Sequence, residues 1–86
     1  MRLGELLRDI AIESLDGDPE LAIAEVRDDS RLVGAGDLFV ALPGLTVDGH
    51  DFVRQAAARG AAAVVTERPV EFPGAVARVA SAARAL

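Results

Sequence analysis

Hydrophobic residues in the first ten positions recur with the spacing of an amphipathic helix. The stripe at positions i, i+3, i+4 and i+7 consists of Leu3, Leu6, Leu7 and Ile10, which one face of a helix brings together. Residues 16–19 then interrupt the pattern with loop-forming types. Residues 21–26 form a weaker strand candidate, in which Ile23 and Val26 are the expected core members. The sequence therefore predicts an N-terminal helix, a loop and a short strand.

The middle of the chain has the pattern of a strand, a helix and a second strand. Residues 38–42 are an unbroken apolar run between turn-forming residues, as in a strand buried on both faces. Asp48 is a good candidate N-cap for the helix, and Gly60 is a suitable left-handed stop. The expected buried face of this helix consists of Phe52, Val53, Ala56 and Ala57. With a second apolar run at 61–66, residues 38–66 predict a crossover unit with parallel strands.

The last third of the chain continues this alternation. Prolines mark a loop at residues 69–73, and residues 75–79 form a short final strand. A helical spacing runs to the last residue through Val79, Ala82, Ala83 and Leu86. This unfinished pattern indicates that the natural chain continues beyond residue 86. The predicted fold class is α/β: a single small domain, residues 1–86, with a short mixed or parallel sheet packed by helices.

Composition narrows the possible functions. Hydrophobic residues make up 51% of the chain and charged residues 27%, which is typical of a globular protein. The net charge of −5, without aromatic residues interleaved among the arginines, argues against nucleic acid as a partner. No apolar run approaches the roughly 20 residues that span a bilayer, and the N-terminus lacks a signal-peptide core. We expect no membrane association and a cytoplasmic location, consistent with the absence of cysteine.

The sequence offers little for catalysis. It contains no lysine, so a phosphate loop of the G-x-x-x-x-G-K-[ST] type is excluded within these residues. His50 is the single histidine, and we interpret it as a partly exposed or locally bonded residue at a helix start. A metal site built from His50 with Asp48 and Asp51 is disfavoured, because residues one or two apart on a helix diverge. We therefore predict no catalytic residue and no metal ligand.

Three polar loops remain as candidate binding segments: residues 28–31, 34–37 and 44–49. In open α/β sheets, ligands bind beyond the carboxyl ends of the strands. The loop 44–49 leaves a predicted strand and enters a helix, and its flanking glycines let the main chain approach a flat ligand closely. Asp48 as N-cap opposes a phosphate at this helix start. The loop therefore favours a neutral group such as a nucleobase.

An ordered series of motifs resembles the N-terminal domain of the Mur ligases. The series runs D-S-R at 29–31, G-D-L-F-V-A-L-x-G at 36–44, D-G-H-x-F at 48–52, an alanine at 56 and G-A-A-A-V-V at 60–65. It covers roughly residues 23–67. Serine in the first motif favours the MurE branch, which adds the third stem-peptide residue. The MurF branch, which adds the terminal dipeptide, is the alternative within the family, and a stand-alone α/β protein-interaction module is the alternative outside it.

The resemblance implies that this domain holds the uridine end of a UDP-N-acetylmuramoyl-peptide. The family's contact serine matches Ser30, and Asp28 takes a position that is often apolar in relatives. The uracil-facing loop maps to Leu45, Thr46 and Val47, where backbone groups are expected to match the uracil edge. Leu45 or Val47 would then cover the base. For Arg31, a contact with the diphosphate and a salt bridge with neighbouring aspartates remain equally open.

The resemblance also implies a division of labour in the parent protein. The complete ligases use ATP and magnesium to activate a carboxylate as an acyl phosphate, which an amino acid then attacks. For the MurE branch that amino acid is diaminopimelate or lysine. None of the motifs for these steps is present, so we expect this chain to be inactive alone and to hold no cofactor. Its expected partners are the substrate and the remaining domains of the ligase.

Overall fold

A computed structural model of the chain describes residues 1–44 and 48–86. Its elements follow the chain in this order: α1 (Leu3–Leu6), β1 (Ile12–Asp16), β2 (Val26–Arg27), the 3₁₀ turn η1 (Ser30–Leu32), β3 (Leu38–Val40), the 3₁₀ turn η2 (Gly49–Phe52), α2 (Val53–Ala58), β4 (Ala63–Thr66), β5 (Ala75–Val79) and the 3₁₀ turn η3 (Ala82–Ala85).

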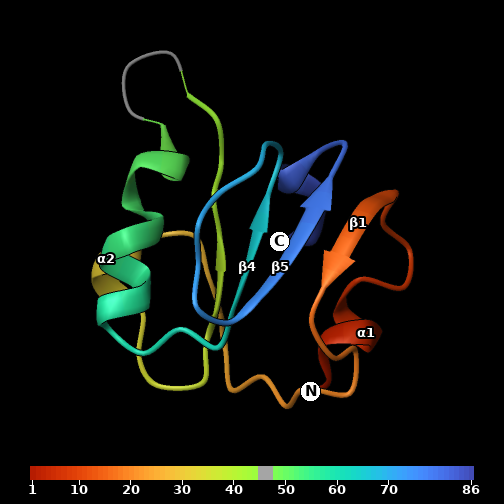
Figure 1. Ribbon diagram of the computed structural model, residues 1–86, viewed down its shortest axis with the longest axis horizontal. Helices are drawn as coiled ribbons and strands as arrows, with labels where there is room; N and C mark the ends of the chain where they lie inside the picture. Colours follow the sequence, from red (N-terminus) through yellow and green to blue (C-terminus); the bar gives the residue numbers. More distant parts are fainter. Residues whose placement is uncertain (45–47) are drawn as a thin grey trace.

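The strands form one mixed sheet in the order β1-β5-β4-β3-β2. Strands β2 to β5 pair in parallel, whereas β1 runs antiparallel to β5 at one edge. Helix α2 lies on one side of the sheet, and α1 lies with the end of the chain on the other (Figure 1). The predicted α/β class and the parallel β3–α2–β4 unit are confirmed.

Alternation along the central strands divides the core into two layers. On β3, Leu38 and Val40 belong to the cluster that also contains Leu3 of α1, whereas Phe39 belongs to the cluster under α2. All residues of β3 and β4 are buried, as expected for strands covered on both faces. The chain just beyond β3 lies beside the start of η2, because the backbone N–H of Gly49 donates to the carbonyl of Leu42 at 2.7 Å.

The predicted N-terminal helix is wrong in length. Helix α1 ends at Leu6, and the following chain forms strand β1, which the sequence did not predict. Four of its five residues are exposed and Leu15 is half-buried, so the strand has no apolar alternation to reveal it. The strand predicted at 21–26 is also displaced, because regular pairing begins only at Val26. Ile23 is nevertheless buried, as predicted.

The helix predicted after Asp48 is confirmed as η2 followed by α2. Its stop at Gly60 is confirmed by a φ of 95°, in the left-handed region that favours glycine. Two other expectations fail. Phe52 is 37% exposed rather than buried, and the helical pattern at the end of the chain is reduced to the 3₁₀ turn η3. The strand predicted at residues 75–79 is confirmed as β5.

Candidate functional site

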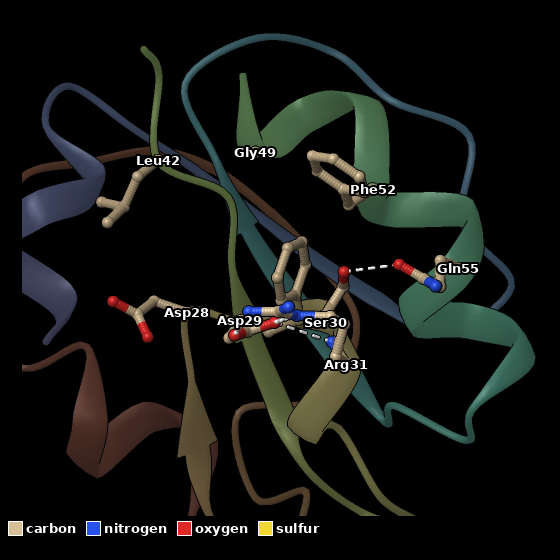
Figure 2. A pocket seen from close by; sticks show the side chains of 9 residues that line it. Asp28, Asp29, Ser30, Arg31, Leu42, Gly49, Phe52 and Gln55 are labelled. Carbon is tan, nitrogen blue, oxygen red and sulfur yellow. Dashed lines mark hydrogen bonds and ion pairs between the residues drawn. The ribbon is translucent and has the colours of Figure 1, made fainter. Parts of the chain in front are cut away.

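A pocket of about 650 Å³ lies beyond the carboxyl ends of β2 and β3. Its walls come from η1, β3, η2 and α2 (Figure 2). The residues that line it are Asp28, Asp29, Ser30, Arg31, Phe39, Leu42, Gly49, Phe52 and Gln55. The location agrees with the rule that ligands of α/β sheets bind at this edge. Its volume is within the range of sites for small molecules.

Asp29 organises the turn on one side of the pocket. Its side chain is the N-cap of η1 and accepts a hydrogen bond from the backbone N–H of Arg31 at 2.9 Å. The Arg31 guanidinium also donates to both carboxylate oxygens, from Nε at 3.0 Å and Nη2 at 2.8 Å. The side-chain and backbone hydrogen bonds from Arg31 lower the pKa of Asp29 to about 2. Of the two roles left open for Arg31, the structure thus contains the salt bridge.

Ser30, the first residue of η1, is buried on the side of that turn that faces α2. It is 6% exposed, and its Oγ donates a hydrogen bond of 2.6 Å to Oε1 of Gln55. The contact joins two residues that are 25 positions apart, and Figure 2 shows it as the dashed line between the two side chains. Gln55 is an exposed residue of α2 and also lines the pocket.

Hydrogen bonds between Asp48 and His50 fix the start of η2. Asp48 is the N-cap and accepts from the backbone N–H of His50 at 2.9 Å and from its Nδ1 at 2.7 Å. Because the backbone N–H of Glu67 donates to Nε2 at 3.0 Å, Nε2 must accept and Nδ1 carries the hydrogen. Of the two alternatives given for His50, local bonding is confirmed, and its side chain is 2% exposed.

The low pKa of Asp48 predicts a loss of stability in acid. Hydrogen bonds from the backbone and side chain of His50, followed by that from Arg68, lower its pKa to about 2, whereas an unfolded aspartate has a pKa of about 3.9. A depressed folded-state pKa stabilises the fold above the unfolded pKa, and this contribution is lost as the pH falls from about 4 towards 2. Carboxyl ¹³C titration and urea unfolding at several pH values measure both effects.

Asp48→Asn is the matched variant for this prediction, because asparagine still caps a helix but does not titrate. As the pH is lowered from about 4 towards 2, we expect the unfolding free energy of this variant to decrease less steeply than that of the wild type. An Asp48 carboxyl that titrates near the ordinary aspartate value would contradict the prediction.

The structure brings three of the six predicted binding residues into one pocket: Ser30, Asp28 and Arg31. Leu45, Thr46 and Val47 lie outside the described residues. The residues that flank their loop, Leu42 and Gly49, line the pocket and are joined by a backbone hydrogen bond of 2.7 Å.

Within residues 1–44 and 48–86, no cluster of three or more histidine, cysteine, aspartate or glutamate side chains suits a metal ion. No helix in this part of the chain is long and apolar enough to cross a membrane.

The fold and the site together define a small α/β domain with a pocket of small-molecule size at the carboxyl edge of its sheet. A family model described as "Mur ligase family, catalytic domain" matches residues 22–85. The chain therefore belongs to the Mur ligase family. The matched segment contains no lysine, so no lysine-containing phosphate loop lies within it.

Individual relatives agree with this assignment. The chain is 49% identical over 70 residues to the UDP-N-acetylmuramoyl-L-alanyl-D-glutamate–2,6-diaminopimelate ligase of Geobacillus kaustophilus, a match that covers 81% of the chain and 14% of that protein. Among solved structures, MurF from Acinetobacter baumannii superposes with a TM-score of 0.82 at 31% identity, covering 98% of the chain and 19% of MurF. MurF from Thermotoga maritima in complex with ADP gives 0.64 at 35% identity, over 73% of the chain and 15% of that protein. The chain thus spans less than a fifth of each of these relatives.

Proposed function

We propose that residues 1–86 are the N-terminal domain of a peptidoglycan-precursor ligase and hold the uridine end of a UDP-N-acetylmuramoyl-peptide. The observation that carries the proposal is the pocket at the carboxyl edge of the sheet, which polar Ser30 lines together with apolar Phe39 and Leu42. Such a site combines apolar cover with a few placed polar groups, as small-molecule sites do. The names of the sequence relatives supply the class of substrate.

The MurE reaction is the better assignment for the parent protein. Relatives named as diaminopimelate ligases are 42–50% identical to the chain, whereas the MurF structures named above are 31–35% identical. In this proposal the parent joins diaminopimelate or lysine to UDP-N-acetylmuramoyl-L-alanyl-D-glutamate with ATP. The chain itself offers neither a lysine nor, among its described residues, a carboxylate cluster for magnesium. We therefore assign ATP and magnesium to other domains of that protein.

A titration of the ¹⁵N-labelled chain with UDP tests the proposal. We expect amide shifts confined to residues 28–31, 42–44 and 48–55, with a dissociation constant of the order of 1 mM, equivalent to about −4 kcal/mol. The affinity is weak because the rest of the substrate contacts domains that this chain lacks. ADP serves as the control, since it carries the same diphosphate on a different base. Equal shifts with ADP, or shifts confined to exposed faces away from the pocket, would contradict uridine binding.

A further inference from the structure

Glu67 anchors the last turn of the chain from outside that turn. Ser81 is the N-cap of η3, but its side chain makes no capping hydrogen bond. Instead, Oε2 of Glu67 accepts from the backbone N–H of Ala82, the first residue of η3, at 2.8 Å, and a carboxylate is a strong acceptor for such an N–H. The hydrogen bonds within η3, donated by Arg84 and Leu86, are both 3.3 Å long and have the poorer geometry of a 3₁₀ turn. The place of η3 therefore depends on the contact with Glu67 and on the burial of Ala82.

The backbone of the same residue is bonded to the pocket side of the domain. The Glu67 N–H donates to Nε2 of His50 at 3.0 Å, and Nδ1 of His50 donates to Asp48 at 2.7 Å. Because the His50 side chain is 2% exposed, these two bonds are shielded from water. Asp48 is the N-cap of η2, and two residues of η2, Gly49 and Phe52, line the pocket. A continuous series of hydrogen bonds therefore runs from the pocket wall to Glu67.

Glu67 thereby joins the two layers that flank the sheet. It directly follows β4, where Val64 belongs to the cluster under α2 and Val65 to the cluster that contains Leu3 of α1. Turn η2 leads into α2, whereas η3 lies on the other side of the sheet with α1 (Figure 1). One hydrogen bond of Glu67 reaches each side. Because both bonds come from a single residue at the end of a buried strand, the pocket wall and η3 are held in one relative position.

Resting on the proposed function, we propose that Glu67 is a positioning residue that holds the end of this domain in a fixed place relative to the uridine pocket. The chain spans 14% of the diaminopimelate ligase named above, so most of such a ligase lies outside it. A substrate held by its uridine end must present its reacting carboxylate to the ATP-using domains. The contact of Glu67 with η3 then sets how those domains lie relative to the bound substrate. This matters because a misplacement of about 1 Å between reacting groups can cost about 100-fold in rate.

A spin label at the end of the chain tests this role directly. The chain contains no cysteine, so Leu86→Cys provides a single attachment site, at a residue that is 61% exposed. We expect the label to broaden a confined set of amide signals in β3 and β4, against which η3 packs. In Glu67→Met, which removes the acceptor at similar side-chain length, this broadening should weaken and spread to residues further away. Hydrogen exchange of the Ala82 amide should become about tenfold faster, as expected for the loss of one hydrogen bond.

Two further variants identify the hydrogen bond as the cause. Glu67→Gln retains an oxygen acceptor at the same position, so its label pattern and its Ala82 exchange should match those of the wild type. Glu71→Met is the control, because it removes an exposed glutamate from the loop between β4 and β5. Thermal unfolding checks that every variant is folded, since a loss of global stability alone does not alter the label pattern of the folded chain. A Glu67→Met chain with the wild-type label pattern, or a Glu67→Gln chain that behaves like Glu67→Met, would overturn the proposal.

The complete ligase that contains this domain tests the consequence for the reaction. Glu67→Met should lower kcat about tenfold, because the bound substrate is no longer aligned with the ATP-using domains. KM for the UDP-linked substrate should stay within about twofold of the wild-type value, because the residues that line the pocket are unchanged. Glu67→Gln should restore kcat. An unchanged kcat in Glu67→Met, or a rise in KM alone, would overturn the positioning role.

UDP titration of the same chains separates this inference from the proposed function. Glu67→Met should bind UDP like the wild type, because Glu67 acts on η3 and not on the ligand. If the wild-type chain shows no saturable shifts with UDP, the proposed function is wrong, whatever the label shows. If UDP binding is normal and the label pattern of Glu67→Met is that of the wild type, only the role of Glu67 is wrong.

Discussion

Replacing Phe39 with alanine is expected to destabilise the chain by about 3–5 kcal/mol, the cost typical of removing a fully buried aromatic ring. Phe39 is 1% exposed and is the largest fully buried side chain of the domain. It lies on β3, with β2 and β4 paired on either side. A domain of this size has roughly 4–13 kcal/mol of stability, at about 0.05–0.15 kcal/mol per residue. Urea unfolding followed by circular dichroism measures the loss.

Phe52→Ala is the control, because it removes the same ring from a position that is 37% exposed. Its cost should stay below about 1.5 kcal/mol, since much of that ring remains in water in the folded state. Both rings line the pocket. A difference in unfolding free energy between the two variants therefore reflects the burial of the rings and not their place at the pocket. Similar losses of unfolding free energy in the two variants would contradict the burial that distinguishes these phenylalanines.

The contrast between these two rings shows where sequence reasoning succeeds. Phe39 sits in an unbroken apolar run between turn residues, and such a run predicts a doubly covered strand without reference to the rest of the fold. The same holds for the apolar run that became β4. The strand at 75–79 and the helix stop at Gly60 were also predicted from a few neighbouring residues. These elements carry their signal within a few residues.

Features that depend on distant partners were not predictable in this way. Strand β1 is an exposed edge strand that exists because it pairs with β5, about 60 residues further along the chain. Phe52 continues the helical stripe in the sequence, but its position before the first turn of α2 leaves its ring at the pocket. His50 is buried where the backbone N–H of Glu67, 17 residues further along the chain, donates a hydrogen bond to its ring.

Some residues of the candidate site could likewise be predicted from local sequence motifs, and others could not. Ser30, Asp28 and Arg31 were predicted from the resemblance to the Mur ligases, which marks residue types at fixed spacing. The salt bridge of Arg31 with Asp29 was one of two open alternatives. Hydrogen bonds from the backbone and guanidinium of Arg31 to Asp29, the N-cap of η1, favour it. Gln55 was missed, because its contact with Ser30 arises only when α2 packs beside η1. The roles of Leu45, Thr46 and Val47 stay predictions.

Replacing Gly49 with alanine is expected to force apart the two main-chain segments that approach each other at residues 42 and 49, on the lining of the pocket. A Cβ at this position would lie 2.5 Å from the backbone nitrogen of Leu42 and 2.8 Å from its carbonyl oxygen. Both atoms belong to the main chain, so no side-chain rotation relieves the overlap. The hydrogen bond from the Gly49 N–H to the Leu42 carbonyl, 2.7 Å long, must therefore lengthen or break.

The expected cost has two parts. Overpacking costs about 1–3 kcal/mol, and the lost backbone hydrogen bond adds about 1 kcal/mol, so the unfolding free energy should fall by about 2–4 kcal/mol. Because Leu42 and Gly49 both line the pocket, their separation also changes its shape. We expect UDP affinity to drop at least about tenfold, equivalent to 1.4 kcal/mol. Urea unfolding and the UDP titration measure these two effects on the same sample.

Gly34→Ala is the control that separates a general effect of glycine replacement from the close approach at Gly49. The nearest atom to a Cβ at Gly34 is Oδ2 of Asp37 at 3.7 Å, an ordinary van der Waals distance, and the φ of Gly34 is not positive. There the loss of chain freedom in the unfolded state should leave stability unchanged or raise it by about 0.4–1 kcal/mol, with normal UDP binding. Equal behaviour of the two variants would mean that the junction of residues 42 and 49 does not shape the site. A Gly49→Ala chain that is less stable yet binds UDP normally would confine the role of this glycine to folding.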